Sequence, residues 1–124
     1  MRSILLTLVF VCLLAGCQSG DGPSDIDRAG PALQAALEAW RAGTPPGELE
    51  SGSPSILMNE SDWQSGKRLL EFKMEDKGSM YGRQVRWRAQ LKVQDKGGYL
   101  EDYTATYVID TTPRIVIVRD AFAS

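Results

Sequence analysis

Residues 84–110, QVRWRAQLKVQDKGGYLEDYTATYVID, decide the fold of this chain. Apolar and polar residues alternate along two runs, and the turn-forming residues Asp95-Lys96-Gly97-Gly98 separate them. Such alternation is typical of half-buried β-strands, and a short break containing glycine is typical of a hairpin. The stretch therefore predicts two long antiparallel strands joined by a tight turn.

The register of this hairpin follows from parity. A slip of one residue would place the apolar side chains of one strand beside the polar side chains of the other. We therefore predict that Leu91 lies across from Tyr103, Trp87 from Tyr107, Val85 from Ile109 and, on the opposite face, Lys92 from Asp102. A shift of two residues satisfies the same parity and stays open.

Further strands are predicted on both sides of the hairpin. Apolar residues alternate with charged ones from Lys67 to Glu75, which indicates a half-buried strand. A continuous apolar run from Ile115 to Val118 predicts a fourth long strand that ends at Arg119-Asp120 and is covered on both faces. The region from Thr44 to Gly66 is rich in Gly, Pro and Ser, and we expect a loop there with a short edge strand around residues 55–58.

One helix is predicted before these strands, from Asp27 to Ala42. Its apolar stripe has the spacing i, i+3, i+4 and i+7 and consists of Leu33, Ala36, Leu37 and Trp40. Pro31 is expected in the first turn, where its missing N–H is tolerated, with the N-cap at Asp27 or Gly30. Gly43, followed by two prolines, is expected to end the helix.

These elements predict an α+β domain in which one N-terminal helix packs on a four-stranded antiparallel meander sheet. The order of elements resembles the cystatin-like and NTF2-like architectures, in which a curved sheet wraps one helix. The cystatin inhibitory loop, Gln-x-Val-x-Gly, is absent, because Gln84-Val85 continues into a strand. NTF2-like enzymes also carry more helices than this chain predicts.

The N-terminus has the layout of an export signal. Arg2 precedes an apolar run, Ile4 to Leu14, which is too short to span a bilayer as a helix. Residues Leu14-Ala15-Gly16-Cys17 resemble the lipobox of bacterial lipoproteins. The resemblance implies that Cys17 carries a diacylglyceryl group on its sulfur, that cleavage occurs before it, and that a further fatty acid such as palmitate is added to its amino group. The alternative is an ordinary secretory signal with a chance cysteine.

The expected organisation is a signal peptide over residues 1–16, a lipidated Cys17 with a flexible tether over residues 17–26, and a single domain over residues 27–124. The membrane is then a partner through the lipid on Cys17, and the protein belongs to the bacterial cell envelope. Gln18, in place of Asp after the modified cysteine, resembles the pattern exported to the outer membrane.

The composition excludes several classes of chemistry. The 124 residues contain no His and two Cys, of which Cys12 lies in the expected signal peptide. There is thus no imidazole base, no Ser-His or Cys-His pair and no His-ligated metal. The formal charge of −2 argues against nucleic acid as a partner. No Gly-rich phosphate loop or Cys/His cluster is present, so we expect no metal and no cofactor.

Four side chains are candidates for ligand or partner contact. Arg86, Arg88 and Lys92 share the polar face of the first hairpin strand, where they could receive an anionic group. The alternative is a solvated face with cross-strand pairing. Trp63 is either a recognition residue or a core anchor that holds its loop, and the same choice applies to Trp40.

Catalysis would need a carboxylate and a phenol to form an acid–base pair. The candidates in the second hairpin strand are Asp102 or Asp110 with Tyr103 or Tyr107. Alternation places Asp102 and Tyr103 on opposite faces, which argues against such a pair. We therefore do not expect an enzyme.

Three segments resemble small envelope proteins of planctomycete-type bacteria: AALEAWRAG (residues 35–43), SDWQSGKRL (residues 61–69) and YVIDTTPRIVIVRD (residues 107–120). They correspond to the helix, a Trp-Gly turn and the final hairpin, and they imply a fold and an envelope location but no activity. We expect a binding or structural module that contacts an envelope protein through a sheet edge or the loop from Thr44 to Gly66. The alternative is a small-ligand binder with a cavity between helix and sheet.

Overall fold

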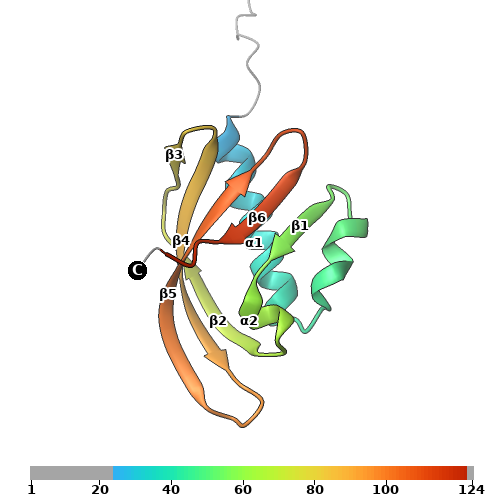
Figure 1. Ribbon diagram of the computed structural model, residues 1–124, viewed down its shortest axis with the longest axis vertical. Coiled ribbons are helices and arrows are strands. Elements are labelled where there is room, and N and C mark those ends of the chain that lie inside the picture. Colours follow the sequence, from blue (N-terminus) through green and yellow to red (C-terminus); the bar gives the residue numbers. More distant parts are fainter. Residues whose placement is uncertain (1–23, 123–124) are drawn as a thin grey trace, which may run out of the picture.

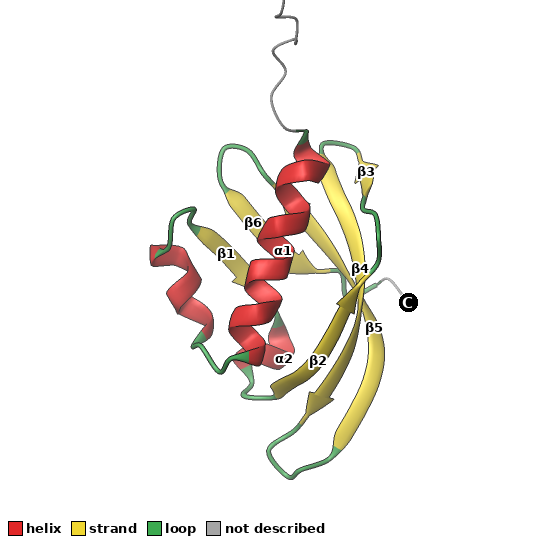
Figure 2. Cartoon of the chain, turned by 180° about the vertical axis from the view of Figure 1, so that it is seen from behind, coloured by secondary structure: helices red, strands yellow, loops and turns green. Residues whose placement is uncertain are grey.

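The computed structural model describes residues 24–122, which form one long helix, two short helical segments and a curved sheet of six strands (Figure 1). Helix α1 (Asp25–Arg41) lies against one face of the sheet (Figure 2). The mixed α+β class predicted from the sequence is confirmed. The expected signal peptide, Cys17 and residues 18–23 of the tether lie outside the described residues.

Helix α1 begins two residues earlier than the sequence analysis predicted. Ser24 is the N-cap: its hydroxyl accepts the Asp27 N–H (3.1 Å), and the Asp27 carboxylate accepts the Ser24 N–H (3.3 Å). The expected N-cap at Asp27 or Gly30 is wrong because this reciprocal capping box lies upstream. Pro31 consequently sits inside the helix and not in its first turn. The predicted stripe of Leu33, Ala36, Leu37 and Trp40 is buried, as expected.

The six strands are β1 (Ile56–Asn59), β2 (Arg68–Met74), β3 (Ser79–Tyr81), β4 (Gln84–Gln94), β5 (Leu100–Asp110) and β6 (Ile115–Arg119). Their order is β1-β6-β5-β4-β2, with β3 also paired to β4. Strands β2, β4, β5 and β6 form the predicted antiparallel meander. The predicted β4–β5 register is confirmed at all four pairs: Leu91 with Tyr103, Trp87 with Tyr107, Val85 with Ile109 and Lys92 with Asp102.

The four-stranded prediction is incomplete, because β1 and β3 join the sheet. The edge strand expected near residues 55–58 is β1, and it runs parallel to β6 with Ile56 beside Ile115. Strand β3 was not predicted; it pairs with β4, with Ser79 beside Arg86. The loop from Thr44 to Gly66 also contains two helical segments that were not predicted, η2 (Pro46–Ser51) and α2 (Ser61–Gln64).

Strand β6 is short, and its coverage differs from the prediction. It has five residues, and Val118 is 38% exposed. Ile117, by contrast, is completely buried. Helix α1 lies on only one face of the sheet, and within residues 24–122 no second layer covers the other face of β6 (Figure 2). The expectation that both faces are covered is therefore wrong.

Tryptophan side chains anchor the core. The indole N–H groups of Trp40, Trp63 and Trp87 donate to the backbone carbonyls of Lys67 (2.9 Å), Thr44 (3.0 Å) and Glu75 (2.8 Å). The ring of Trp87 lies so close to Gly30 and Gly78 that a Cβ on either would approach it within 2.9 and 2.3 Å. Because buried indoles need a hydrogen-bond acceptor, these contacts tie the loops to the sheet.

Candidate functional site

A network of polar side chains is built into the core around Glu60, which is completely buried. The Arg119 guanidinium donates from Nε to Glu60 Oε1 (2.8 Å) and from Nη2 to Oε2 (3.1 Å). The Tyr107 hydroxyl donates to Oε1 (2.7 Å), and the Asp62 N–H donates to Oε2 (2.8 Å). The buried carboxylate thus accepts four hydrogen bonds and faces a cation, as a buried charge requires.

The same guanidinium extends the network toward the surface. Arg119 Nη2 also donates to Asp62 Oδ2 (2.8 Å) and to the Tyr103 hydroxyl (2.7 Å), and the guanidinium lies over the Tyr103 ring (4.9 Å). The Tyr103 hydroxyl in turn donates to Asp62. Lys67 Nζ lies 3.5 Å from Asp62 Oδ1 and 3.1 Å from Glu101 Oε1. We call this set the Glu60–Arg119 network; its members are Glu60, Asp62, Lys67, Tyr103, Tyr107 and Arg119.

The sheet topology explains why these residues meet. Glu60 follows the end of β1 and caps α2, and its side chain accepts the Asp62 N–H there. Because β1 runs parallel to β6, the C-terminal ends of both strands lie side by side at one end of the sheet. Arg119 is the last residue of β6. Arg119 pairs with Tyr107 of β5, so both side chains lie on the face that packs against α1.

Burial and pairing shift the pKa values of the network. Burial raises the pKa of Asp62, but the hydrogen bonds from Tyr103 and Arg119 outweigh it and leave that pKa below its usual value of 3.8. Burial and the carboxylate partners raise the pKa of Tyr103 and of Tyr107. Burial lowers the pKa of Arg119, yet its hydrogen bonds and charge interaction with Glu60 raise it overall. At neutral pH, Asp62 and Arg119 are charged and both phenols are protonated.

A surface hollow opens beside the network, between α2 and β5. Its wall includes Asp62, Lys67, Tyr103 and Arg119 from the network, and Tyr99 and Leu100 from the β4–β5 hairpin. Tyr99 and Leu100 are 70% and 51% exposed. The hollow therefore combines fixed charges of both signs with an exposed apolar rim, which suits recognition of a bound molecule.

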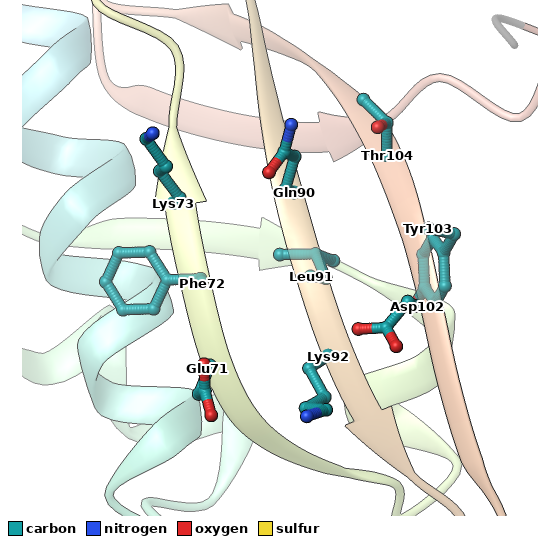
Figure 3. A pocket seen from close by; sticks show the side chains of 9 residues that line it. All are labelled: Glu71, Phe72, Lys73, Gln90, Leu91, Lys92, Asp102, Tyr103 and Thr104. Atoms are coloured by element: carbon teal, nitrogen blue, oxygen red, sulfur yellow. The ribbon is translucent and has the colours of Figure 1, made fainter.

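A second hollow lies on the sheet between β2, β4 and β5 (Figure 3). The charged side chains that line it are of both signs: Glu71, Lys73, Lys92 and Asp102. The candidate Lys92 is therefore part of this hollow, across from Asp102 as the parity predicted.

The other two candidate cations lie on the same face, each beside a carboxylate. Arg86 Nη2 lies 3.0 Å from Asp120 Oδ2, and the guanidinium lies over the Tyr81 ring (4.6 Å). Arg88 Nε lies 3.6 Å from Glu75 Oε2. The structure does not bring Arg86, Arg88 and Lys92 together on one ligand position, and these pairings favour the solvated-face interpretation.

Trp63 lies in the core and not on a recognition surface. It is 5% exposed and stacks on Trp40, with ring centroids 6.0 Å apart and an interplanar angle of 17°. Together with its hydrogen bond to Thr44, this stacking holds α2 against α1. Trp40 itself is buried, so the core-anchor interpretation of that residue is confirmed.

Carboxylate–phenol pairs do exist, but with partners that the sequence analysis missed. Tyr103 and Tyr107 pair with Asp62 and Glu60 and not with Asp102 or Asp110. Asp110 instead accepts a hydrogen bond from Gln84 (3.3 Å). The missed signal is that two tyrosines and Arg119 occupy core-facing positions of β5 and β6, where each polar group needs a buried partner.

Within residues 24–122, no three His, Cys, Asp or Glu side chains are grouped so that they could hold a metal ion. In the same part of the chain, no helix has the length and apolar character needed to cross a membrane. No protein-family model matches the chain, and neither does any curated protein or solved structure.

Proposed function

We propose that this protein is a lipid-anchored binding module of the bacterial envelope, attached through Cys17 and acting by contact with another molecule and not by catalysis. The lipobox-like residues 14–17 support the anchor, and Gln18 favours the outer membrane. A curved sheet against one long helix agrees with a cystatin-like or NTF2-like layout, which we include in the proposal.

The short stretch between Cys17 and Ser24 limits how far the domain can lie from a lipid on Cys17. Only six residues separate Cys17 from Ser24, and a chain spans at most about 3.6 Å per residue. The acylated sulfur would therefore lie within about 25 Å of the N-terminus of α1. Helix α1 starts at the end of the molecule where β3 lies, and the β4–β5 hairpin reaches the opposite end (Figure 1). In an anchored protein, the β4–β5 hairpin and the hollow between α2 and β5 would face away from the lipid.

The observation that carries the proposal of binding over catalysis is the internal pairing of the Glu60–Arg119 network. Glu60 accepts four hydrogen bonds from the protein itself. A general base must be free to take a proton from a substrate within hydrogen-bond reach. The raised pKa values of Tyr103 and Tyr107 keep both phenols protonated, so they are not bases at neutral pH. The network is suited to hold α2 on the sheet.

A second candidate is a small ligand in the hollow between α2 and β5. It is favoured by the partly exposed Asp62, Lys67 and Arg119, which place charges of both signs beside Tyr99 and Leu100. Such a ligand would carry a polar group for the charges and an apolar group for the rim. Native mass spectrometry of the purified full chain tests it: a reproducible mass adduct that Lys67→Ala abolishes supports the ligand, and an adduct-free mass argues against it.

The main proposal is tested by a photo-cross-linking amino acid at Tyr99 of the full chain in intact cells. Tyr81 serves as the matched control, because it is also an exposed tyrosine (57%) but lies in β3, at the anchored end. We expect cross-links to a different envelope protein from position 99 and markedly fewer from position 81. Equal cross-linking at both positions, or none at position 99, would overturn the proposal.

A further inference from the structure

Strand β2 is an open edge of the sheet. It pairs with β4 on one side, and on its other side no strand of residues 24–122 is present. An open edge exposes backbone N–H and C=O groups to which another strand can add.

Two hydrogen bonds determine the direction of the backbone groups. The Glu75 N–H donates to the Arg88 C=O (2.9 Å), so Glu75 faces β4, and antiparallel pairing alternates from residue to residue. Lys73 and Glu71 therefore also face β4, and the N–H and C=O of Phe72 face outward. The bond from the Asp95 N–H to the Tyr99 C=O (3.0 Å) gives the same result when the alternation is followed along β4.

The side chains on either side of Phe72 carry opposite charges. Glu71 and Lys73 are both exposed, and they lie opposite Lys92 and Gln90 of β4. Neither residue takes part in an ion pair within the described part of the chain. The Phe72 ring turns toward α1 (Figure 3), where the Arg41 guanidinium lies over it at 5.0 Å.

We propose that β2 pairs in antiparallel fashion with β2 of a second copy of this chain, about a two-fold axis at Phe72. The outward N–H of Phe72 then donates to the C=O of the partner's Phe72, and the reverse bond forms by symmetry. Glu71 lies opposite the partner's Lys73, and Lys73 lies opposite the partner's Glu71. Two charge pairs therefore form at once. Both are non-hydrogen-bonded pairs, in which the Cα atoms and side chains of opposite residues lie closest together.

Charge favours the axis at Phe72 over an axis at either neighbouring residue. An axis at Glu71 would place two carboxylates directly opposite each other, and an axis at Lys73 would do the same with two ammonium groups. The pairing at Phe72 does not depend on the lipid at Cys17 or on the hollow beside the Glu60–Arg119 network, so its failure would leave the proposed function standing.

Charge exchange tests the pairing. The full chain, purified in detergent, is measured by sedimentation over a range of concentrations. We expect a dimer whose dissociation constant rises about tenfold or more in Glu71→Lys and in Lys73→Glu, because each places like charges opposite one another twice. The double variant Glu71→Lys/Lys73→Glu restores opposite charges and should restore the dimer. A monomer at all concentrations, or a double variant as weak as the singles, would overturn the proposal.

Disulfide trapping in cells gives an independent test of the register. Chains with Glu71→Cys and chains with Lys73→Cys are co-expressed with tags of different length. In the proposed register these two positions are directly opposite, with Cα atoms about 4.5 Å apart, which is within the range of a disulfide. Each variant expressed alone is the matched control, because its cysteines are only diagonal neighbours. Mixed-tag dimers should dominate; same-tag dimers in equal yield would contradict the register.

Discussion

The Glu60 carboxylate and the Arg119 guanidinium, 59 residues apart in the chain, form a two-contact pair at 2.8 and 3.1 Å. Glu60 is completely buried and the Arg119 side chain is 22% exposed. The pair joins the segment after β1 to the end of β6. It therefore links the loop that carries α2 to the sheet.

Removal of the Arg119 guanidinium should strongly lower the free energy of unfolding. Arg119→Ala leaves the buried Glu60 carboxylate without its partner, and such a change costs roughly 3 to 5 kcal/mol of unfolding free energy. The measurement is urea denaturation of the full chain. Arg88→Ala is the control, because its pair with Glu75 at 3.6 Å is half exposed and should cost less than about 1 kcal/mol. Equal losses of unfolding free energy in the two variants would show that the Glu60–Arg119 network does not hold α2 on the sheet.

Acid should destabilise the protein partly through Asp62. Its folded pKa lies below 3.8, so its carboxylate contributes stability that is present above the unfolded pKa, near 4, and is lost as the pH falls through the folded pKa. Asp62→Asn should therefore lower the unfolding free energy at neutral pH and flatten its decline below about pH 4. Denaturation curves across this range provide the check, and an unchanged decline would contradict the assignment.

Substitution of Gly78 should lower the free energy of unfolding, because the site has no room for a side chain. A Cβ there would lie 2.3 Å from Trp87 Cε3, and the Trp87 ring is held by its hydrogen bond to Glu75. We expect Gly78→Ala to lose about 1 to 3 kcal/mol, the usual cost of overpacking. Gly47→Ala is the control, because a Cβ at that position meets nothing within 4 Å. Thermal unfolding distinguishes the two, and equal stability would mean that the Trp87 ring moves freely.

Replacement of Cys17 tests the anchor. Cys17→Ala removes the thiol to which the diacylglyceryl group would attach, and we expect an unprocessed precursor without fatty acid. Metabolic labelling with radioactive palmitate and the size of the product on a gel supply the readout. Cys12→Ala, in the expected signal peptide, should leave labelling unchanged. A labelled, processed product from Cys17→Ala would refute the lipoprotein proposal.

The local pattern predicted much of this fold. Alternation along residues 84–110 predicted both long strands and their register, because a one-residue slip would mix apolar and polar faces. The helical stripe from Leu33 to Trp40 was equally clear. The helix start was misplaced at Asp27, because the capping box with Ser24 lies before the apolar stripe begins.

The candidate site was not predictable from such patterns. Glu60 and Asp62 lie in a polar segment that has no periodicity, and α2 is only four residues long. Their partners Tyr103, Tyr107 and Arg119 lie 41 to 59 residues away. Nothing in the local spacing indicates that β1 lies parallel to β6, and without that pairing Glu60 and Arg119 do not meet.

The sequence by itself determined the export-like N-terminus, the helix and the β4–β5 hairpin, since each depends on residues close together in the chain. The tertiary structure alone decided the parallel placement of β1, the Glu60–Arg119 network and the open edge of β2. The physical reason is that a buried charge requires a partner but does not specify which one. Only the folding of distant segments onto one sheet brings Arg119 to Glu60.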